Sequence, residues 1–133
     1  MPAQSLNHYT IQVRDLEATK NFYTDIVGLT VGDRPPLAFS GYWLYCGGVP
    51  VVHLIYNRAG DKPIEGAPET GRLDHIAFSC TELREMRTKL MQHKIAYEER
   101  VLPRLNMTQL FYRDLDGITI EMNFPPEETE ARA

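Results

Sequence analysis

The feature that most constrains the fold of this chain is an internal duplication. His8, in the alternating stretch "LNHYTIQV", is repeated 67 residues later as His75 in "LDHIAFSC". The last alternating stretch of each half also corresponds, because His53 in "VVHLIY" is matched by Glu121 in "ITIEMN". A chain that repeats its strand pattern in this way is expected to fold as two copies of one supersecondary unit.

Each half is expected to form a β-α-β-β-β module. Alternating hydrophobicity predicts the strands, and apolar residues at helical spacing predict one helix after the first strand of each half. The expected elements of the first half are a strand at 6–13, a helix at 16–27, and strands at 29–34, 38–46 and 49–57. Those of the second half are a strand at 72–80, a helix at 82–94, and strands at 95–101, 105–114 and 118–124. Asp15 and Thr81 are the predicted N-caps of the two helices, and Gly28 ends the first helix.

The two modules are predicted to span residues 5–57 and 72–124 of a single domain, 1–133. Between them, residues 58–71 are rich in glycine and proline and are expected to form a linker. The polar tail 125–133 is expected to fray. The predicted fold class is α+β, with two tandem modules that form a curved, cup-shaped mixed sheet and carry their helices on the outside.

Strand alternation places four chemically active side chains on the sheet face that the helices leave uncovered. They come from the first and last strand of each half: His8, His53, His75 and Glu121. Imidazoles and a carboxylate that converge inside a cup suit Fe(II), Ni(II), Mn(II) or Zn(II). A single histidine on such a face is more often hydrogen-bonded or solvated than a ligand, whereas a repeat-matched set of four favours a metal site. His53 lies in the more apolar strand, where a pocket wall is the alternative to a ligand.

The stretch "YWLY" (42–45) also presents two pairs of side chains to opposite faces of a strand. Trp43 and Tyr45 share one face, and Tyr42 and Leu44 share the other. One pair is expected in the core, and the other can line the cup. Alternation alone does not decide between the two arrangements.

The bulk properties of the chain exclude several classes of partner. A net charge of -4 and a pI near 5.5 do not suggest nucleic acid or an anionic membrane. No apolar run approaches the ~20 residues that span a bilayer, and the first ten residues lack the apolar core of a signal peptide. Cys46 and Cys80 form no paired motif. An intracellular, cytoplasmic protein with reduced thiols is therefore expected.

Three segments together resemble the vicinal oxygen chelate family. "LNHYTIQVRDLEATKNFYTDIVGLTV" is similar to the opening of that family, and "LDHIAFSC" is similar to the start of its second module. "RDLDGITIEMN" resembles the closing "DPDG…IE" strand, with Leu115 where proline is usual. The resemblance implies a fold of paired βαβββ modules and a divalent metal that faces adjacent oxygens of a substrate. It also implies a homodimer, in which one cup often combines a module from each of two chains.

The resemblance further implies roles for individual residues. His8, His75 and Glu121 fall on the ligand positions that the family shares, and His53 falls on the fourth, where glyoxalase I has a second glutamate. Thr10 corresponds to a threonine that assists the substrate in fosfomycin-resistance transferases. These matches imply a metal-dependent enzyme, either a lyase or isomerase of glyoxalase type or a ring-cleaving dioxygenase, with a metal-bound enediolate or catecholate. In that enzyme Glu121 or His53 would move a proton, unless His53 is a fourth ligand.

Two other classes of function stay open at the level of sequence. The first is a metal-free or non-catalytic small-molecule-binding protein, as in bleomycin resistance, although such proteins typically lack the ligand set found here. The second is a structural metal site without turnover. The chain carries no readable signature for glutathione, coenzyme A or a nucleotide, so substrate, metal and reaction subclass are not predicted.

Overall fold

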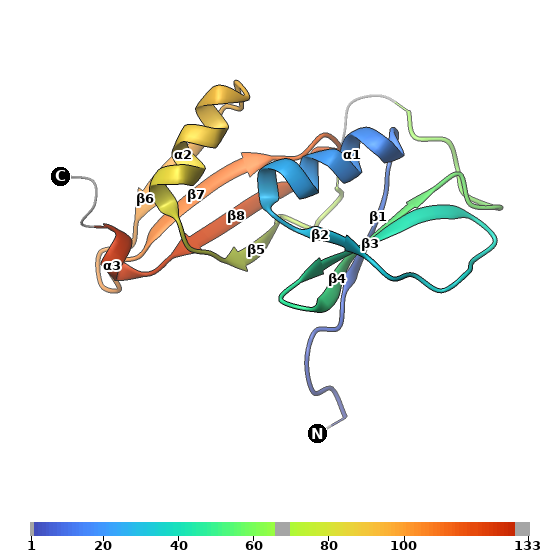
Figure 1. The fold of residues 1–133 in the computed structure, drawn as a ribbon, viewed down its shortest axis with the longest axis horizontal. Helices are drawn as coiled ribbons and strands as arrows, with labels where there is room; N and C mark the ends of the chain where they lie inside the picture. The colour runs from blue at the N-terminus through green and yellow to red at the C-terminus, as the bar shows by residue number, and fades with distance from the viewer. Residues whose placement is uncertain (1, 66–69, 130–133) are drawn as a thin grey trace. The chain divides into compact units, whose positions relative to one another are not determined.

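The computed structural model describes residues 2–65 and 70–129. The chain divides into two compact units, Met1–Gly66 and Ala67–Ala133, which we call module 1 and module 2. Each module contains one four-stranded mixed sheet, with the strand orders β1-β4-β3-β2 and β5-β8-β7-β6 (Figure 1). The two orders are equivalent under the duplication. The α+β class and the repeated module, both predicted from sequence, are therefore confirmed.

Module 1 follows the predicted order of elements. It contains β1 (Tyr9–Gln12), α1 (Leu16–Phe22), the π-helical turn η1 (Tyr23–Val27), β2 (Thr30–Gly32), β3 (Ser40–Cys46) and β4 (Val49–Tyr56). β1 is parallel to β4, and β4, β3 and β2 are antiparallel neighbours. Asp15 caps α1, because its side chain accepts a hydrogen bond of 3.1 Å from the Ala18 backbone N–H. Gly28 ends the helical segment in the left-handed region, at φ 97°, where glycine is favoured because it has no side chain.

Module 2 repeats the order and adds a short helix at its end. It contains β5 (His75–Ser79), α2 (Leu83–Gln92), β6 (Glu98–Val101), β7 (Thr108–Arg113), β8 (Thr119–Phe124) and α3 (Pro126–Thr129). β5 is parallel to β8, and β8, β7 and β6 are antiparallel. The prediction that the tail frays is wrong for its first part, because Pro126–Thr129 is helical and Thr129 is buried. The Thr129 hydroxyl donates to the Asn106 carbonyl at 2.7 Å and lies 2.7 Å from the Thr108 hydroxyl. Residues 130–133 lie outside the described part of the chain.

The N-terminus of α2 is capped by a residue distant in the sequence. Thr81 was predicted to cap this helix, and that prediction is wrong, because the cap position is Glu82 at φ 68° and makes no side-chain capping bond. Instead, the Glu128 carboxylate accepts hydrogen bonds from the backbone N–H groups of Glu82 (3.1 Å) and Leu83 (2.8 Å). A carboxylate is favoured at this end of a helix because the unpaired N–H groups carry partial positive charge.

The core of each module lies on the sheet face that its helix covers, as alternation predicts. In module 1, α1 packs on β3 and β4, and the buried residues include Ile11, Val13, Tyr23, Ile26, Leu44, Val52 and Leu54. In module 2 they include Leu83, Met86, Leu90, Leu110, Tyr112, Ile120 and Met122. The opposite face of each sheet carries the polar side chains singled out above.

The predicted linker contains no helix or strand in the stretches 58–65 and 70–71, and residues 66–69 lie outside the described part of the chain. Within it, Asp61 accepts from the Arg58 backbone N–H at 3.1 Å and pairs with the Arg58 guanidinium at 3.0 Å. Among the described residues, no helix is long and apolar enough to cross a membrane.

Candidate functional site

In module 1, His53 is the centre of a stack of three rings. Strand register places His53 of β4 beside Thr10 of β1 and Trp43 of β3, so the three residues form one row across the sheet. The His53 ring centroid lies 3.7 Å from that of His8 and 4.1 Å from that of Trp43, with interplanar angles of 13° and 11°. The prediction that His8 lies within the first strand is wrong, because β1 begins at Tyr9 and His8 directly precedes it. His53 is buried between its two neighbours, with 8% of its surface exposed.

The side chains of "YWLY" divide between the two faces of the sheet. Leu44 is fully buried, and the Tyr42 hydroxyl donates to Glu17 of α1, so this pair faces the helix. Trp43 and Tyr45 are the alternate pair, and Trp43 stacks on His53. The Tyr45 hydroxyl is held by a backbone carbonyl, that of residue 33, at 2.6 Å. The alternative that sequence left open is thus resolved in favour of a tryptophan on the uncovered face.

The hydrogen bond of His53 determines which ring nitrogen is available. His53 Nε2 lies 3.0 Å from the Pro50 carbonyl oxygen, which can only accept, so Nε2 carries the hydrogen. Burial, together with the nearby His8, lowers the pKa of His53 and favours the neutral ring. The neutral ring then has its lone pair on Nδ1. Because the rings of His8 and His53 are nearly parallel and face to face, their in-plane lone pairs do not converge on one point.

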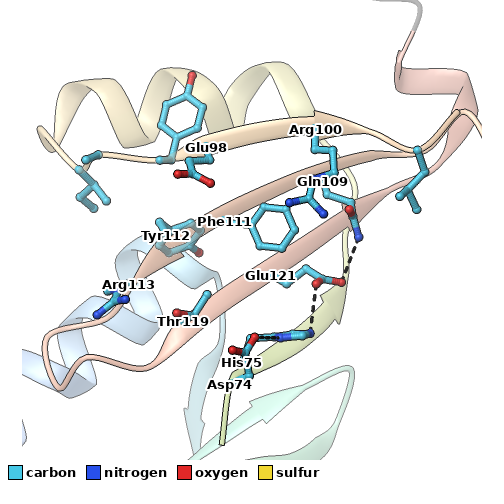
Figure 2. Close-up of a pocket in the computed structure, with 14 residues that line it drawn as sticks. Asp74, His75, Glu98, Arg100, Gln109, Phe111, Tyr112, Arg113, Thr119 and Glu121 are labelled. Carbon is cyan, nitrogen blue, oxygen red and sulfur yellow. Dashed lines mark hydrogen bonds and ion pairs between the residues drawn. The ribbon is translucent and has the colours of Figure 1, made fainter. Parts of the chain in front are cut away.

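In module 2, His75 and Glu121 face each other on the uncovered side of the sheet (Figure 2). His75 Nε2 lies 3.2 Å from Glu121 Oε1. The other carboxylate oxygen, Oε2, accepts hydrogen bonds from Gln109 Nε2 (3.2 Å) and Asn123 Nδ2 (2.8 Å). The two amides also bond each other, from Gln109 Nε2 to Asn123 Oδ1 at 2.9 Å. Two amide groups therefore hold one oxygen of Glu121 and leave the other directed at His75.

The duplication extends to the residue that precedes each of two histidines. His8 Nδ1 lies 2.7 Å from Asn7 Oδ1, and His75 Nδ1 lies 2.8 Å from Asp74 Oδ2. In both cases an oxygen holds Nδ1 and Nε2 remains as the other ring nitrogen. The hydrogen bond to Asp74 also raises the pKa of His75. A histidine that binds a metal commonly makes this kind of contact through its second nitrogen.

The donor set of module 2 fits two neighbouring ligand positions of a divalent metal. Two ligand atoms bound at about 2.1 Å, at angles between octahedral and tetrahedral, lie roughly 3.0–3.4 Å apart. The 3.2 Å between His75 Nε2 and Glu121 Oε1 falls in this range. Within residues 2–65 and 70–129, no three His, Cys, Asp or Glu side chains are grouped closely enough to hold a metal. The structure thus brings the predicted residues together as two pairs, and the set of four remains a prediction.

The His75–Glu121 pair borders a pocket of about 850 Å³, formed by residues of module 2. Small-molecule sites in proteins have volumes of this order. Besides the pair, its lining includes Arg100, Gln109, Phe111 and Arg113 (Figure 2). Gln109, Phe111 and Arg100 were not predicted as site residues, because the register of β6, β7 and β8 determines which residues lie beside Glu121, and the sequence does not fix that register.

Comparison with known proteins identifies the family to which this fold belongs. The model of the Glyoxalase/Bleomycin resistance protein/Dioxygenase superfamily matches residues 5–122. A protein of Arabidopsis thaliana named "Glyoxylase I 4" is 30% identical over 121 residues, covering 89% of this chain and 69% of the relative. The Escherichia coli protein YaeR, described as uncharacterized, is 27% identical over 124 residues, covering 90% of this chain and 95% of the relative.

Solved structures show the same fold. A glyoxylase/bleomycin resistance protein/dioxygenase domain from Frankia sp. EAN1pec superposes with a TM-score of 0.71 at 22% identity, covering 92% of this chain and 98% of that one. The family match spans nearly the whole chain, from before His8 to beyond Glu121. The chain therefore belongs to the glyoxalase/bleomycin resistance/dioxygenase superfamily, which includes metal-dependent enzymes.

Proposed function

We propose that the chain is a metal-dependent enzyme that acts on a small molecule with adjacent oxygens. The observation that carries the proposal is the His75–Glu121 pair, whose facing atoms lie 3.2 Å apart while hydrogen bonds hold the other nitrogen and the other oxygen. Such contacts to the second nitrogen and the second oxygen orient the two facing atoms, as is common for metal ligands. The superfamily supports two reaction types, the lyase or isomerase chemistry of glyoxalases and the ring cleavage of dioxygenases.

In this proposal His8, His75 and Glu121 hold a divalent ion, one of Fe(II), Ni(II), Mn(II) or Zn(II). When bound, the ion supplies positive charge that stabilises negative charge on the substrate oxygens. Thr10, Trp43 and Tyr45 supply substrate contacts on the uncovered face of module 1. The protein is also proposed to be cytoplasmic and to form a homodimer. Sedimentation at micromolar concentration tests the oligomeric state.

His53 is proposed to move a proton and not to bind the metal. Its Nε2 donates to the Pro50 carbonyl, and its ring is stacked between Trp43 and His8. These contacts fix the ring and leave Nδ1 as the basic nitrogen. A neutral imidazole is suited to accept a proton near neutral pH. Glu121 is the alternative acceptor through Oε1.

Metal titration of the metal-free protein tests the proposal. We expect at least one of the four ions to bind stoichiometrically in isothermal calorimetry, with Fe(II) handled without oxygen. The loaded protein should then convert a hemithioacetal, a hydroxyketone or a catechol, and a catechol should react only with oxygen present. Failure of all four ions to bind would contradict the proposal. Metal and ligand binding without turnover of any substrate would indicate a binding protein.

Replacing Gln109 by leucine should weaken metal binding by roughly 10- to 100-fold, the usual cost of losing a contact to a metal ligand. Leucine has a similar volume but cannot donate to Glu121 Oε2, so the carboxylate loses one of the two amides that orient it. Competition with a chelator measures the affinity. Gln92→Leu, on the exposed surface of α2, is the matched control and should leave the affinity unchanged. An affinity of Gln109→Leu within twofold of wild type would show that the amide does not position Glu121.

A further inference from the structure

The uncovered face of the module 2 sheet is an ordered array of side chains. Strand register arranges the outward-facing residues in rows that run from β5 to β6. The first row is His75, Thr119 and Arg113; the second is Ala77, Glu121, Phe111 and Glu98; the third is Ser79, Asn123, Gln109 and Arg100. The His75–Glu121 pair occupies one side of this array, and β6 forms the opposite side (Figure 2).

Arg100, on β6, is a cation that has no anionic partner among the described residues. Its guanidinium carbon lies 5.1 Å from the centre of the Phe111 ring, over which it rests (Figure 2). In the part of the chain that the structure describes, no carboxylate or carbonyl contacts this guanidinium. A guanidinium held over an aromatic ring keeps its N–H donors in its own plane, where they can bind a planar anion.

The neighbouring charges on and near β6 are arranged differently. Glu99 is bound by Arg87 of α2 through two bonds, of 2.9 Å and 2.8 Å. Arg87 is thus satisfied within the protein, whereas Arg100 lines the pocket. Glu98 also borders the pocket, as the register neighbour of Phe111. Its negative charge disfavours a ligand that carries several anionic groups near Arg100.

The spacing of the strands relates this cation to the His75–Glu121 pair. Arg100 and Glu121 lie on β6 and β8, which are separated by β7. Two strand spacings amount to about 10 Å across the sheet. Phe111 lies between the two positions, in register with Glu121. A small molecule that reaches from one position to the other therefore passes over an apolar side chain.

We infer that the substrate carries a carboxylate at the end opposite its two adjacent oxygens, and that Arg100 binds this carboxylate. The inference rests on the proposed function, because the His75–Glu121 pair is taken to face the adjacent oxygens. A planar carboxylate matches the fork of the guanidinium and can form two parallel hydrogen bonds with it. Arg100 is then a specificity-determining residue, remote from the reacting atoms.

A pair of isosteric probes tests the inference on the metal-loaded protein. 4-Carboxybenzohydroxamate has two adjacent oxygens at one end and a carboxylate at the other, and 4-carbamoylbenzohydroxamate replaces the carboxylate by a neutral amide. We expect the wild-type protein to bind the carboxylate probe about tenfold more tightly, the scale of a charge-assisted hydrogen bond. In Arg100→Met the preference should fall to within twofold, while affinity for the amide probe is unchanged. Arg100→Lys, which keeps the charge but not the fork, should retain part of the preference.

Arg84→Met, on the exposed surface of α2 and outside the pocket, is the matched control. It should keep the preference for the carboxylate. Equal affinity of the wild-type protein for the two probes would overturn the inference and leave the proposed function standing, since both probes still bind. Arg113 lines the same pocket from β7 and is the rival cation, so a preference lost in Arg113→Met and kept in Arg100→Met would overturn the assignment to Arg100. If neither probe binds to the loaded protein, the proposed function fails, and this inference fails with it.

Discussion

The His75→Ala variant is expected to bind divalent metal at least about 100-fold more weakly than the wild-type protein, because a lost ligand costs more than a lost contact to a ligand. The substitution removes the nitrogen that lies 3.2 Å from Glu121 Oε1 and leaves that oxygen without its neighbour. Half of the module 2 donor pair is then absent. Competition with a chromogenic chelator measures the change over several orders of magnitude.

His93→Ala is the matched control for this measurement. His93 is exposed at the C-terminal end of α2, so its loss removes the same chemical group from a position without a proposed role. It should bind metal as the wild-type protein does. His8→Ala, the repeat equivalent of His75→Ala, should also lose affinity, whereas His53→Ala should keep the metal and lose turnover. Retention of wild-type affinity by His75→Ala would remove the pair from the metal site.

The fold was predictable because its determinants are local and are repeated. Hydrophobicity alternates along the strands that contain Leu54 and Ile120, and this pattern predicts which residues face the helix without any knowledge of distant contacts. Both residues are fully buried in the structure. The cap of α2 was not predictable in this way. The Thr81 hydroxyl was the local candidate, but the capping carboxylate belongs to Glu128. A cap supplied by a segment distant in sequence leaves no pattern near the helix that it caps.

The sequence predicted which residues form the candidate site, but not the hydrogen bonds that hold them. Alternation placed His75 and Glu121 on the uncovered face, and β5–β8 register brings them into contact. The amide of Gln109 was missed because its contact depends on the β7–β8 register, which the turn between these strands determines. The repeated dipeptides Asn7-His8 and Asp74-His75 are a sequence signal for the side-chain oxygen that lies beside each histidine Nδ1.

The bond of His53 to the Pro50 carbonyl had no signal in the sequence. In a regular strand, two residues three positions apart are separated by about 10 Å, too far for a side chain to bond the backbone. The register of β3 with β4 shifts between Leu44 and Tyr45, which pair with Val52 and Pro50 respectively. This irregularity occurs next to Pro50, where a bulge locally bends the strand. Alternation therefore predicted the face of His53 but not its tautomer.

The "RDLDG" segment (113–117) forms the turn between β7 and β8, and its first aspartate, Asp114, stabilises that turn. Asp114 is 6% exposed, and its Oδ1 accepts hydrogen bonds from the backbone N–H groups of Asp116 (2.9 Å) and Ile118 (2.8 Å). The Asp114 N–H in turn donates to the Ile118 carbonyl at 2.9 Å. One side chain thus closes the turn that fixes how β8, with Glu121, pairs with β7.

The Asp114→Ala variant is expected to lose about 2–4 kcal/mol of unfolding free energy, because two buried backbone donors are left without an acceptor. Urea denaturation measures the loss. Asp114→Asn keeps an oxygen at the same position and should lose less, and Leu115→Ala, which is 50% exposed in wild type, should change stability by no more than about 0.5 kcal/mol. If Asp114→Ala is as stable as Leu115→Ala, the turn does not depend on this carboxylate. If the expected order holds, the aspartate that opens this motif stabilises the turn, and the position of Glu121 depends on it indirectly through the β7–β8 register.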